Sequence, residues 1–339
     1  MNNQIIQELL NKYEQKRNKA FKDLEFRKTE LYNKCPRLLE IEQELNSVGF
    51  SISRSILNKN TPNLIDEFKE KINKLNLEKE AIYKKLNIDK KFLTPQFECE
   101  KCKDTGYVLD ENDRSKMCNC LKQQIFDMQY NISNLSNLNK ENFDNFDSSF
   151  FSDEINLEKY NSKISPRKNI ENIKSAAMNF IDNFDNPDTK NLLFTGNTGL
   201  GKTYMTNCIA KELLQKGKTV LYQTAPVLFE QIINEKFSKK ENSSSSFSKN
   251  VLDVDLLIID DLGTECRNSM IISELFTIIN TRLLNLNNKS TKTIISTNLG
   301  IKNIFNNYEE RIGSRIAGFY DIYYFFGEDV RFKLAKKNK

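Results

Sequence analysis

The sequence predicts an α/β protein in which a five-stranded parallel sheet with helices on both faces follows a helical arm and a small four-cysteine module. Three observations lead to this fold class. Apolar residues recur at helical spacing up to about residue 90, four cysteines fall within residues 99–120, and short apolar runs alternate with helical patterns from about residue 170. The length of 339 residues suits about two domains.

The arm, residues 1–90, is expected to form a helical hairpin or a short coiled coil. Its clearest apolar stripe runs through residues 65–86 in steps of three and four. Thr61 and Pro62 fit the cap and the first residue of a helix. The stretch 47–55, which contains a glycine, is expected to break the helix before it.

The cysteine module is expected to span residues 91–130 and to bind zinc. Cys99-x-x-Cys102 and Cys118-x-Cys120 are separated by fifteen residues, which is close to the spacing of four-thiolate zinc sites. Because the chain has no histidine, these cysteines are its one conventional set of structural zinc ligands. Plain thiols, a redox role or an iron–sulfur cluster are the alternatives. The isolated cysteines are treated as structural: Cys35, Cys208 and Cys266.

The sheet domain is expected at residues 170–339, after an interdomain linker. Residues 131–169 are polar, rich in Asn and Ser and weakly patterned, which is typical of a linker. The alternation that follows is the signature of βαβ units. The expected strands are 191–195, 219–223, 256–260, 293–297 and 322–326, and the expected helices are 202–216, 225–237, 269–286 and 307–317.

A phosphate-binding loop follows the first of these strands. Residues 196–203 match G-x-x-x-x-G-K-[ST] between an apolar strand and a helix. The glycines let successive backbone N–H groups point into one concavity, and the helix N-terminus adds positive charge. In a nucleoside triphosphate complex, Lys202 would reach the β and γ phosphates and the Thr203 hydroxyl would bind Mg²⁺. The expected binding residues are Gly196, Asn197, Thr198, Gly199, Leu200, Gly201, Lys202 and Thr203.

Two acids and an amide end two other expected strands. Asp260 and Asp261 follow an apolar run that reads as a strand buried on both faces, so they belong at the carboxyl edge of the sheet. We expect Asp260 to hold Mg²⁺ and Asp261 to orient the attacking water. The alternative is that one acid caps the next helix. Asn298 could hold that water or a γ-phosphate oxygen, or could simply end its strand.

Together these residues resemble the DnaC/DnaI-type AAA+ helicase loaders and the related IstB-type transposition ATPases. The resemblance covers residues 190–331 closely, and the cysteine segment also resembles the loaders' zinc domain. It rests on the phosphate loop, Asp260-Asp261-Leu-Gly-Thr-Glu265, Ser296-Thr297-Asn298, Arg311-Ile-Gly-Ser-Arg315 and Gly327-Glu-Asp-Val-Arg331.

The resemblance implies an AAA+ ATPase domain without a helical lid, whose ATP site is completed by a neighbouring subunit of a homo-oligomer. It implies that Arg315 is the arginine finger, Arg311 its companion and Arg331 a sensor of the nucleotide. A solvated helix face is the alternative for Arg311 and Arg315. Asp261 stands where AAA+ proteins usually have Glu, so hydrolysis is expected to be slow.

The favoured function is a helicase loader that binds the replicative helicase through its N-terminal part, and ATP and single-stranded DNA through its AAA+ domain. An IstB-type transposition helper or another DNA-remodelling ATPase is the alternative, and a P-loop small-molecule kinase is a remote one. The formal charge of +5 is modest, so DNA contact should be local. The stretch 236–249, with its lysines, Phe237 and Phe247, has the composition of such a site.

Composition also excludes several classes of chemistry and location. Without histidine, no imidazole can act as a base or a metal ligand. No apolar run is long enough to span a membrane, and the first residues lack an apolar signal region. We therefore expect a cytoplasmic protein with no membrane partner.

Overall fold

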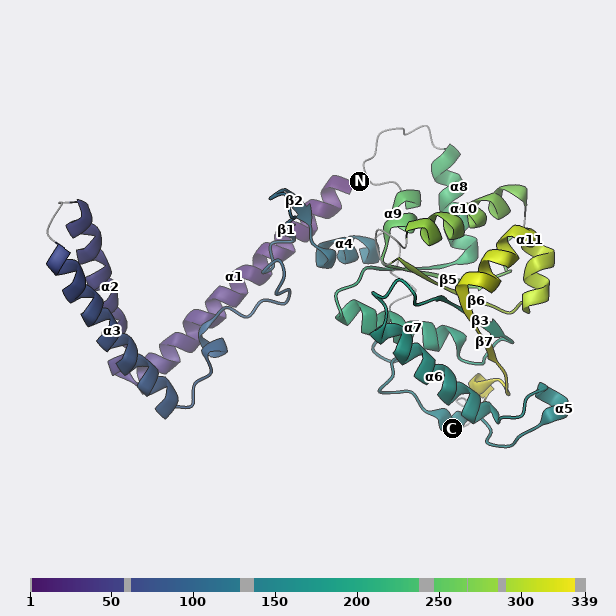
Figure 1. Ribbon diagram of the computed structural model, residues 1–339, viewed down its shortest axis with the longest axis horizontal. Coiled ribbons are helices and arrows are strands. Elements are labelled where there is room, and N and C mark those ends of the chain that lie inside the picture. Colours follow the sequence, from purple (N-terminus) through teal and green to yellow (C-terminus); the bar gives the residue numbers. More distant parts are fainter. Residues whose placement is uncertain are drawn as a thin grey trace. The chain divides into compact units, whose positions relative to one another are not determined.

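The computed structural model describes residues 2–57, 62–128, 137–237, 247–266, 268–285 and 291–332 (Figure 1). The chain divides into two compact units, Met1–Cys118 and Asn119–Lys339. Each unit is described by itself.

The first unit is mainly helical. Its helices are α1 (Asn2–Lys34), α2 (Pro36–Leu57) and α3 (Pro62–Lys85), followed by the 3-10 helix η1 (Lys90–Leu93) and an antiparallel pair, β1 (Tyr107–Leu109) and β2 (Ser115–Met117). Helices α2 and α3 lie side by side as the expected hairpin (Figure 1). The Arg37 guanidinium donates to both oxygens of Glu78, at 2.8 and 3.0 Å, and Lys79 donates to Glu42 at 2.9 Å. These pairs join the two helices.

The expected helix break at residues 47–55 is wrong, because α2 continues to Leu57. Val48 is buried, and the hydroxyls of Ser47 and Ser51 donate to backbone carbonyls three and four residues earlier, at 2.8 and 2.9 Å. The helix therefore continues through Gly49 because tertiary packing outweighs the low helix propensity of glycine. Pro62 begins α3 as expected, whereas Thr61 lies outside the described residues.

The second unit contains the expected five-stranded parallel sheet, in the order β4-β5-β6-β3-β7. Each strand lies within two residues of its expected position. The strands are β3 (Asn191–Gly196), β4 (Val220–Thr224), β5 (Leu256–Leu262), β6 (Lys292–Thr297) and β7 (Tyr320–Phe325). The helices are α4 (Asn119–Phe126), α5 (Leu157–Tyr160), α6 (Pro166–Asp182), α7 (Lys202–Gln215), α8 (Ala225–Phe237), α9 (Phe247–Asp253), α10 (Ser269–Asn285) and α11 (Ile301–Phe319), with a 3-10 turn η3 (Ser148–Phe150).

Helices cover both faces of the sheet, because alternate strand residues enter two separate apolar clusters. Leu193 and Leu257 pack with residues of α8, α9, α10 and α11 on one face. Leu192 and Ile258 pack with residues of α6 and α7 on the other. Apolar residues on both sides of each central strand are what a buried parallel strand requires.

The expected linker was residues 131–169, of which 131–136 lie outside the described part of the chain. Residues 137–169 are not the linker that we expected from their polar composition. Phe151 is buried in the cluster that includes Phe194 of β3, and Phe146 packs against the same cluster. The Tyr204 hydroxyl of α7 donates to the Asn142 carbonyl at 3.0 Å. The aromatic residues scattered through this polar stretch attach it to the second unit, which begins at Asn119.

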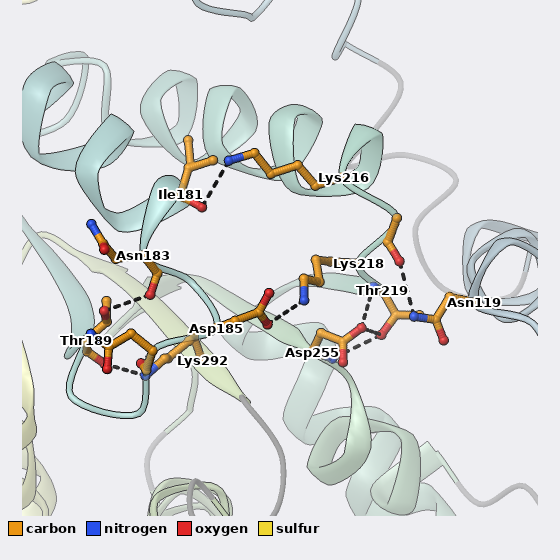
Figure 2. A network of polar contacts seen from close by, with 12 residues as sticks. Asn119, Ile181, Asn183, Asp185, Thr189, Lys216, Lys218, Thr219, Asp255 and Lys292 are labelled. Atoms are coloured by element: carbon orange, nitrogen blue, oxygen red, sulfur yellow. Dashed lines mark hydrogen bonds and ion pairs between the residues drawn. The ribbon is translucent and has the colours of Figure 1, made fainter. Parts of the chain in front are cut away.

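Buried polar groups fix the amino ends of the strands (Figure 2). Asp255, just before β5, accepts bonds of 2.7 Å from both the backbone N–H and the hydroxyl of Thr219. Lys292 of β6 donates to the carbonyl oxygens of Asn186 and Thr189, the first at 3.1 Å. The Arg282 guanidinium of α10 donates to the carbonyl oxygens of residues 251, 252, 254, 255 and 292, the bonds to 251 and 254 being 2.9 Å. These groups satisfy one another and the backbone, which is a structural role.

Candidate functional site

The carboxyl edge of the same sheet begins with the glycine-rich loop between β3 and α7. Gly196, Gly199 and Gly201 have φ of 141°, 75° and 86°, a region that favours glycine. A Cβ on Gly196 would lie 2.1 Å from the Phe325 carbonyl oxygen, and one on Gly199 would lie 2.0 Å from Asp329 Oδ1. The loop can therefore adopt this tight curl only with glycine at these positions.

Lys202 lies at the centre of the curl. Its side chain is buried, and Nζ donates to the carbonyl oxygens of Gly196 and Asn197 at 2.6 and 2.8 Å and to Asn298 Oδ1 at 2.7 Å. Burial lowers the pKa of Lys202, while the charges of Asp261 and Asp260 oppose that shift. The loop thus holds an ammonium group beside two acids in a partly desolvated place.

Asp260, near the end of β5, is a buried acid that collects hydrogen bonds from three neighbouring hydroxyls. Its carboxylate accepts bonds from the hydroxyls of Thr203, Tyr222 and Ser296, the first at 3.2 Å. Burial, followed by the charge of Asp260, raises the pKa of Tyr222. Thr203 and Asp260, the two residues expected to share Mg²⁺, therefore lie within hydrogen-bond distance of each other.

Tyr222 and Ser296 were not among the predicted site residues. Both lie in strands beside β5, and the register that brings their hydroxyls to Asp260 exists only in the assembled sheet. The sequence signal that could have identified these two residues is a hydroxyl near the carboxyl end of an otherwise apolar strand.

Asp261 lies in β5 where the register with β6 shifts, between Ile259 and Leu262, and it has a left-handed backbone with φ 55°. Burial and then the adjacent Asp260 raise the pKa of its carboxyl, while Lys202 opposes the shift. The alternative that one of these acids caps the next helix is not needed, because Asn268 Oδ1 accepts the Ile271 N–H of α10 at 2.9 Å. Two neighbouring carboxylates and a lysine are the groups that bind a cation and a polyphosphate together.

Of the three arginines predicted for the site, Arg331 lies near the phosphate loop. The Val330 N–H donates to the Gly199 carbonyl at 2.9 Å, and the Arg331 guanidinium binds both oxygens of Asp329 at 2.8–3.3 Å. Its charge also contributes to the lowered pKa of Lys202. This arrangement places a second cation near the position expected for phosphate.

Arg311 and Arg315 lie on α11, away from these groups. The Arg311 Nε pairs with Glu309 at 2.8 Å, and its guanidinium stacks 4.5 Å from the ring centre of Phe276. Among the contacts of the described residues, neither arginine reaches the phosphate loop of its own chain. A role in a neighbouring subunit's site requires this separation.

The four predicted zinc ligands do come together. The Sγ atoms of Cys99, Cys102, Cys118 and Cys120 all lie within 4.8 Å of one another, and the first and third are 3.9 Å apart. Tetrahedral zinc with bonds of about 2.3 Å needs sulfur atoms about 3.8 Å apart. Asp104, with left-handed backbone, accepts the Cys99 N–H at 2.9 Å and so folds the segment around the thiols. The donor set and its spacing fit zinc.

The predicted DNA-binding stretch, 236–249, is only partly described. Residues 238–246 lie outside the described part of the chain. Lys236 pairs with Glu274 at 2.5 Å, and Phe237 is 74% exposed. Phe247 is buried in the apolar core, so its ring is not available to stack on a base, and that part of the prediction is wrong.

None of the described helices combines the length and the apolar character that a membrane span needs.

Comparison with known proteins gives one family match and several partial relatives. The model of the family "IstB-like ATP binding protein" matches residues 135–311, about half of the chain. The replicative helicase loader DnaC of Escherichia coli strain K12 is 30% identical over 94 residues, which are 28% of this chain and 38% of that protein. The chromosomal replication initiator protein DnaA of Wolinella succinogenes is 33% identical over 125 residues, 37% of this chain and 26% of the relative.

A crystal structure of the DnaC helicase loader resembles the chain with a TM-score of 0.40 and 24% identity, over 50% of this chain and 95% of that one. The chain matches well under two thirds of the length of its curated relatives.

Proposed function

We propose, because this chain belongs to the family of IstB-like ATP binding proteins, that it is an AAA+ ATPase that loads a replicative helicase onto DNA. The observation that carries the ATPase part is the meeting of Lys202, Asn298 and the Thr203–Asp260 pair at the carboxyl edge of one parallel sheet. The helicase part is supported by the relative named as a replicative helicase loader, which matches over 94 residues.

In this proposal the residues of the site have separate tasks. Lys202 would bind the β and γ phosphates, and Thr203 and Asp260 would hold Mg²⁺, which supplies positive charge at those phosphates. Asp261 would orient the attacking water, and Asn298 would position that water or a phosphate oxygen. The Asn298 side chain already accepts a bond from Lys202, so the residue directly after β6 can respond to what the lysine binds.

The three arginines would complete catalysis. Arg331 would contact the nucleotide of its own chain, whereas Arg315, with Arg311, would reach the nucleotide of a neighbouring copy in a homo-oligomer. A guanidinium beside the γ-phosphate stabilises the charge of the transition state. The position of α11 away from its own phosphate loop supports this division.

The N-terminal part, residues 1–130, would bind the helicase, with zinc held by the four cysteines. Exposed large apolar residues support a partner-binding role for the arm. Phe26 is 65% exposed, Phe50 79% and Leu77 71%, in three different helices. These three residues are therefore the first candidates for contacts with the helicase.

Single-stranded DNA would bind through the AAA+ domain, with the lysines of residues 236–249 and the exposed Phe237 as the first candidates. Charge-reversal of Lys236 and Lys249 should weaken oligonucleotide binding most at low salt, because released counterions supply most of the binding energy. Unchanged binding in that variant would move the DNA site elsewhere.

The test of the helicase partner is co-elution of the full chain with the replicative helicase of its own cell, in ATP and in ADP. We expect a complex whose amount depends on the nucleotide. Phe50→Asp with Leu77→Asp should abolish it, while Leu157→Asp, at a 55% exposed position of the second unit, should not. Absence of co-elution in either nucleotide would contradict the helicase assignment.

The family match also favours a second candidate, an IstB-type transposition helper. That function predicts a stable complex with a transposase in place of the helicase. The same co-elution experiment with both partners separates the two functions.

A further inference from the structure

We propose that Tyr308 and Glu265 are positioning residues that tie the helix of Arg311 and Arg315 to the loop after the two site aspartates. This inference rests on the proposed function, because it takes these arginines to complete a neighbouring subunit's site. It adds a physical connection through which the nucleotide state of one subunit's site can change the position of the arginines that the same subunit presents to its neighbour.

The first link joins the acidic strand to Glu265. β5 ends just beyond Asp260 and Asp261, and the chain turns at Gly263, whose φ is 108°. Glu265 Oε2 accepts the Gly263 N–H at 2.9 Å, and the Glu265 side chain is buried. A Cβ on Gly263 would lie 2.8 Å from Leu299, the residue after Asn298. Glu265 is therefore held by the turn that follows the aspartates, and this turn packs beside the end of β6.

The second link joins Glu265 to α11. Its other oxygen, Oε1, accepts a hydrogen bond from the hydroxyl of Tyr308, which is fully buried. The two oxygens of one buried carboxylate thus bind a backbone N–H of the β5 turn and a phenol of α11. A bond to a charged acceptor is stronger than one between neutral groups, so this contact fixes the distance between the two elements.

The third link is a kink in α11 at Tyr308. Tyr308 has φ −123° and ψ 18°, and Glu309 has φ 70° and ψ 155°, a conformation that non-glycine residues rarely adopt. Beyond the kink, the helix carries both arginines, and the Glu309 carboxylate pairs with Arg311. The direction in which the second half of α11 leaves the kink therefore sets where the arginines point.

Packing around the kink explains why the strained backbone persists. A Cβ on Gly313 would lie 2.6 Å from the ring of Phe305, so the two halves of α11 approach closely at glycine. Backbone strain of this kind persists only where its surroundings determine it. The Tyr308–Glu265 bond is the polar part of those surroundings, and it connects the kink to the same turn that closes β5.

Removal of the Tyr308 hydroxyl should therefore lower turnover in the assembled protein without changing ATP binding. We expect Tyr308→Phe to reduce DNA- or partner-stimulated turnover about tenfold at unchanged affinity for ATP. Tyr320→Phe is the matched control, since Tyr320 directly follows α11 and its buried hydroxyl bonds to Thr293 of β6 instead of Glu265. Glu265→Gln should act like Tyr308→Phe, and the double variant should be no worse than either single one.

Mixed subunits show in which chain the defect lies. Asp261→Asn chains should hydrolyse little but keep intact arginines, so mixing them with Tyr308→Phe chains should raise turnover above the mean of the two separate samples. Arg315→Ala chains mixed in the same way are the positive control. No gain for Tyr308→Phe, where Arg315→Ala gains, overturns the inference alone. Normal turnover of unmixed Arg315→Ala overturns the proposed function, and the inference with it.

Discussion

The two edges of the parallel sheet each bury a lysine, and the two lysines differ in what surrounds them. Burial lowers the pKa of both Lys202 and Lys292, and both Nζ atoms donate to backbone carbonyls. At the amino edge Lys292 donates to the carbonyls of one turn, at residues 186–189, and the charges of Asp188 and Asp185 act on it. At the carboxyl edge Lys202 binds a glycine loop and the Asn298 amide and faces two carboxylates.

The comparison teaches that a buried charge does not by itself mark a functional site. Arg282, at the amino edge, is buried and donates to several carbonyl oxygens and to the Thr293 hydroxyl, and burial lowers its pKa to about 10. At that edge, the charges of Asp188 and Asp185 oppose the effect of burial on the pKa of Lys292. At the carboxyl edge Asp260 and Asp261 are adjacent, and the pKa of Asp261 is raised by burial and by its neighbour. That electrostatic conflict is one a bound cation would relieve, which is characteristic of functional sites.

The cysteine cluster resembles the carboxyl edge, because its four sulfur atoms lie within 4.8 Å of one another and would be held together by a bound cation. Purified chain should contain about one zinc, and Cys99→Ser with Cys102→Ser should lose it. Metal binding of this type contributes about 10 kcal/mol or more to local folding, so the first unit should also become protease-sensitive. Cys35→Ser is the control. A reduced, freshly purified protein without zinc would contradict this prediction.

Arg282→Met should show the largest effect at the amino edge. It leaves several buried carbonyls without a donor, so the free energy of unfolding should fall by about 4 kcal/mol. Urea unfolding measures this change, and ATP affinity of the remaining folded protein should not alter. A loss below about 1 kcal/mol would show that Arg282 is not the brace that its contacts indicate.

Asp261→Asn and Asp255→Asn separate the edges with the same chemical change. At the carboxyl edge, Asp261→Asn should slow turnover about 100-fold, as expected for a group that handles the attacking water. At the amino edge, Asp255→Asn weakens the bonds to Thr219 and should cost about 1–2 kcal/mol of stability with normal turnover. Equal loss of turnover in both variants would remove the distinction.

The smallest expected effect concerns pH. Because the folded-state pKa of Asp261 is raised, its contribution to stability is present below its unfolded pKa of about 3.9 and is lost as pH rises through the folded value. Without nucleotide, Asp261→Asn should therefore be more stable than the natural chain at pH 7, by less than about 1 kcal/mol. The gap should close toward pH 4. If the stability difference between the two proteins grew as pH fell, the pKa of Asp261 would be lowered in the folded state, which would contradict this prediction.

Local patterns predicted most of the sheet, because a buried parallel strand needs apolar residues on both faces and the phosphate loop needs glycine at fixed positions. They also placed Asp260 and Asn298 at one edge. The contacts of Tyr222 and Ser296 with Asp260 depend on strand register, which sequence spacing does not contain.

The errors have a common cause in tertiary packing. Residues 137–169 look like a linker by composition, but scattered aromatic residues attach them to the sheet domain. Phe247 looks like a stacking platform beside lysines, yet the core buries it. The stretch 47–55 looks like a break, but packing keeps it helical. In each case the prediction used only neighbours in sequence, whereas contacts with residues distant in sequence determine the structure.

The most direct test of the difference between the two edges compares Lys202→Met with Lys292→Met in the full chain, by calorimetric titration with Mg·ATP and by urea unfolding. Lys202→Met should weaken ATP binding at least about 100-fold, since the phosphates lose their main cation, and should also lower stability, because its buried acceptors lose their donor. Lys292→Met should lower stability by about 2 kcal/mol and bind ATP normally. Equal ATP affinity in the two variants would contradict the assignment of the carboxyl edge as the nucleotide site.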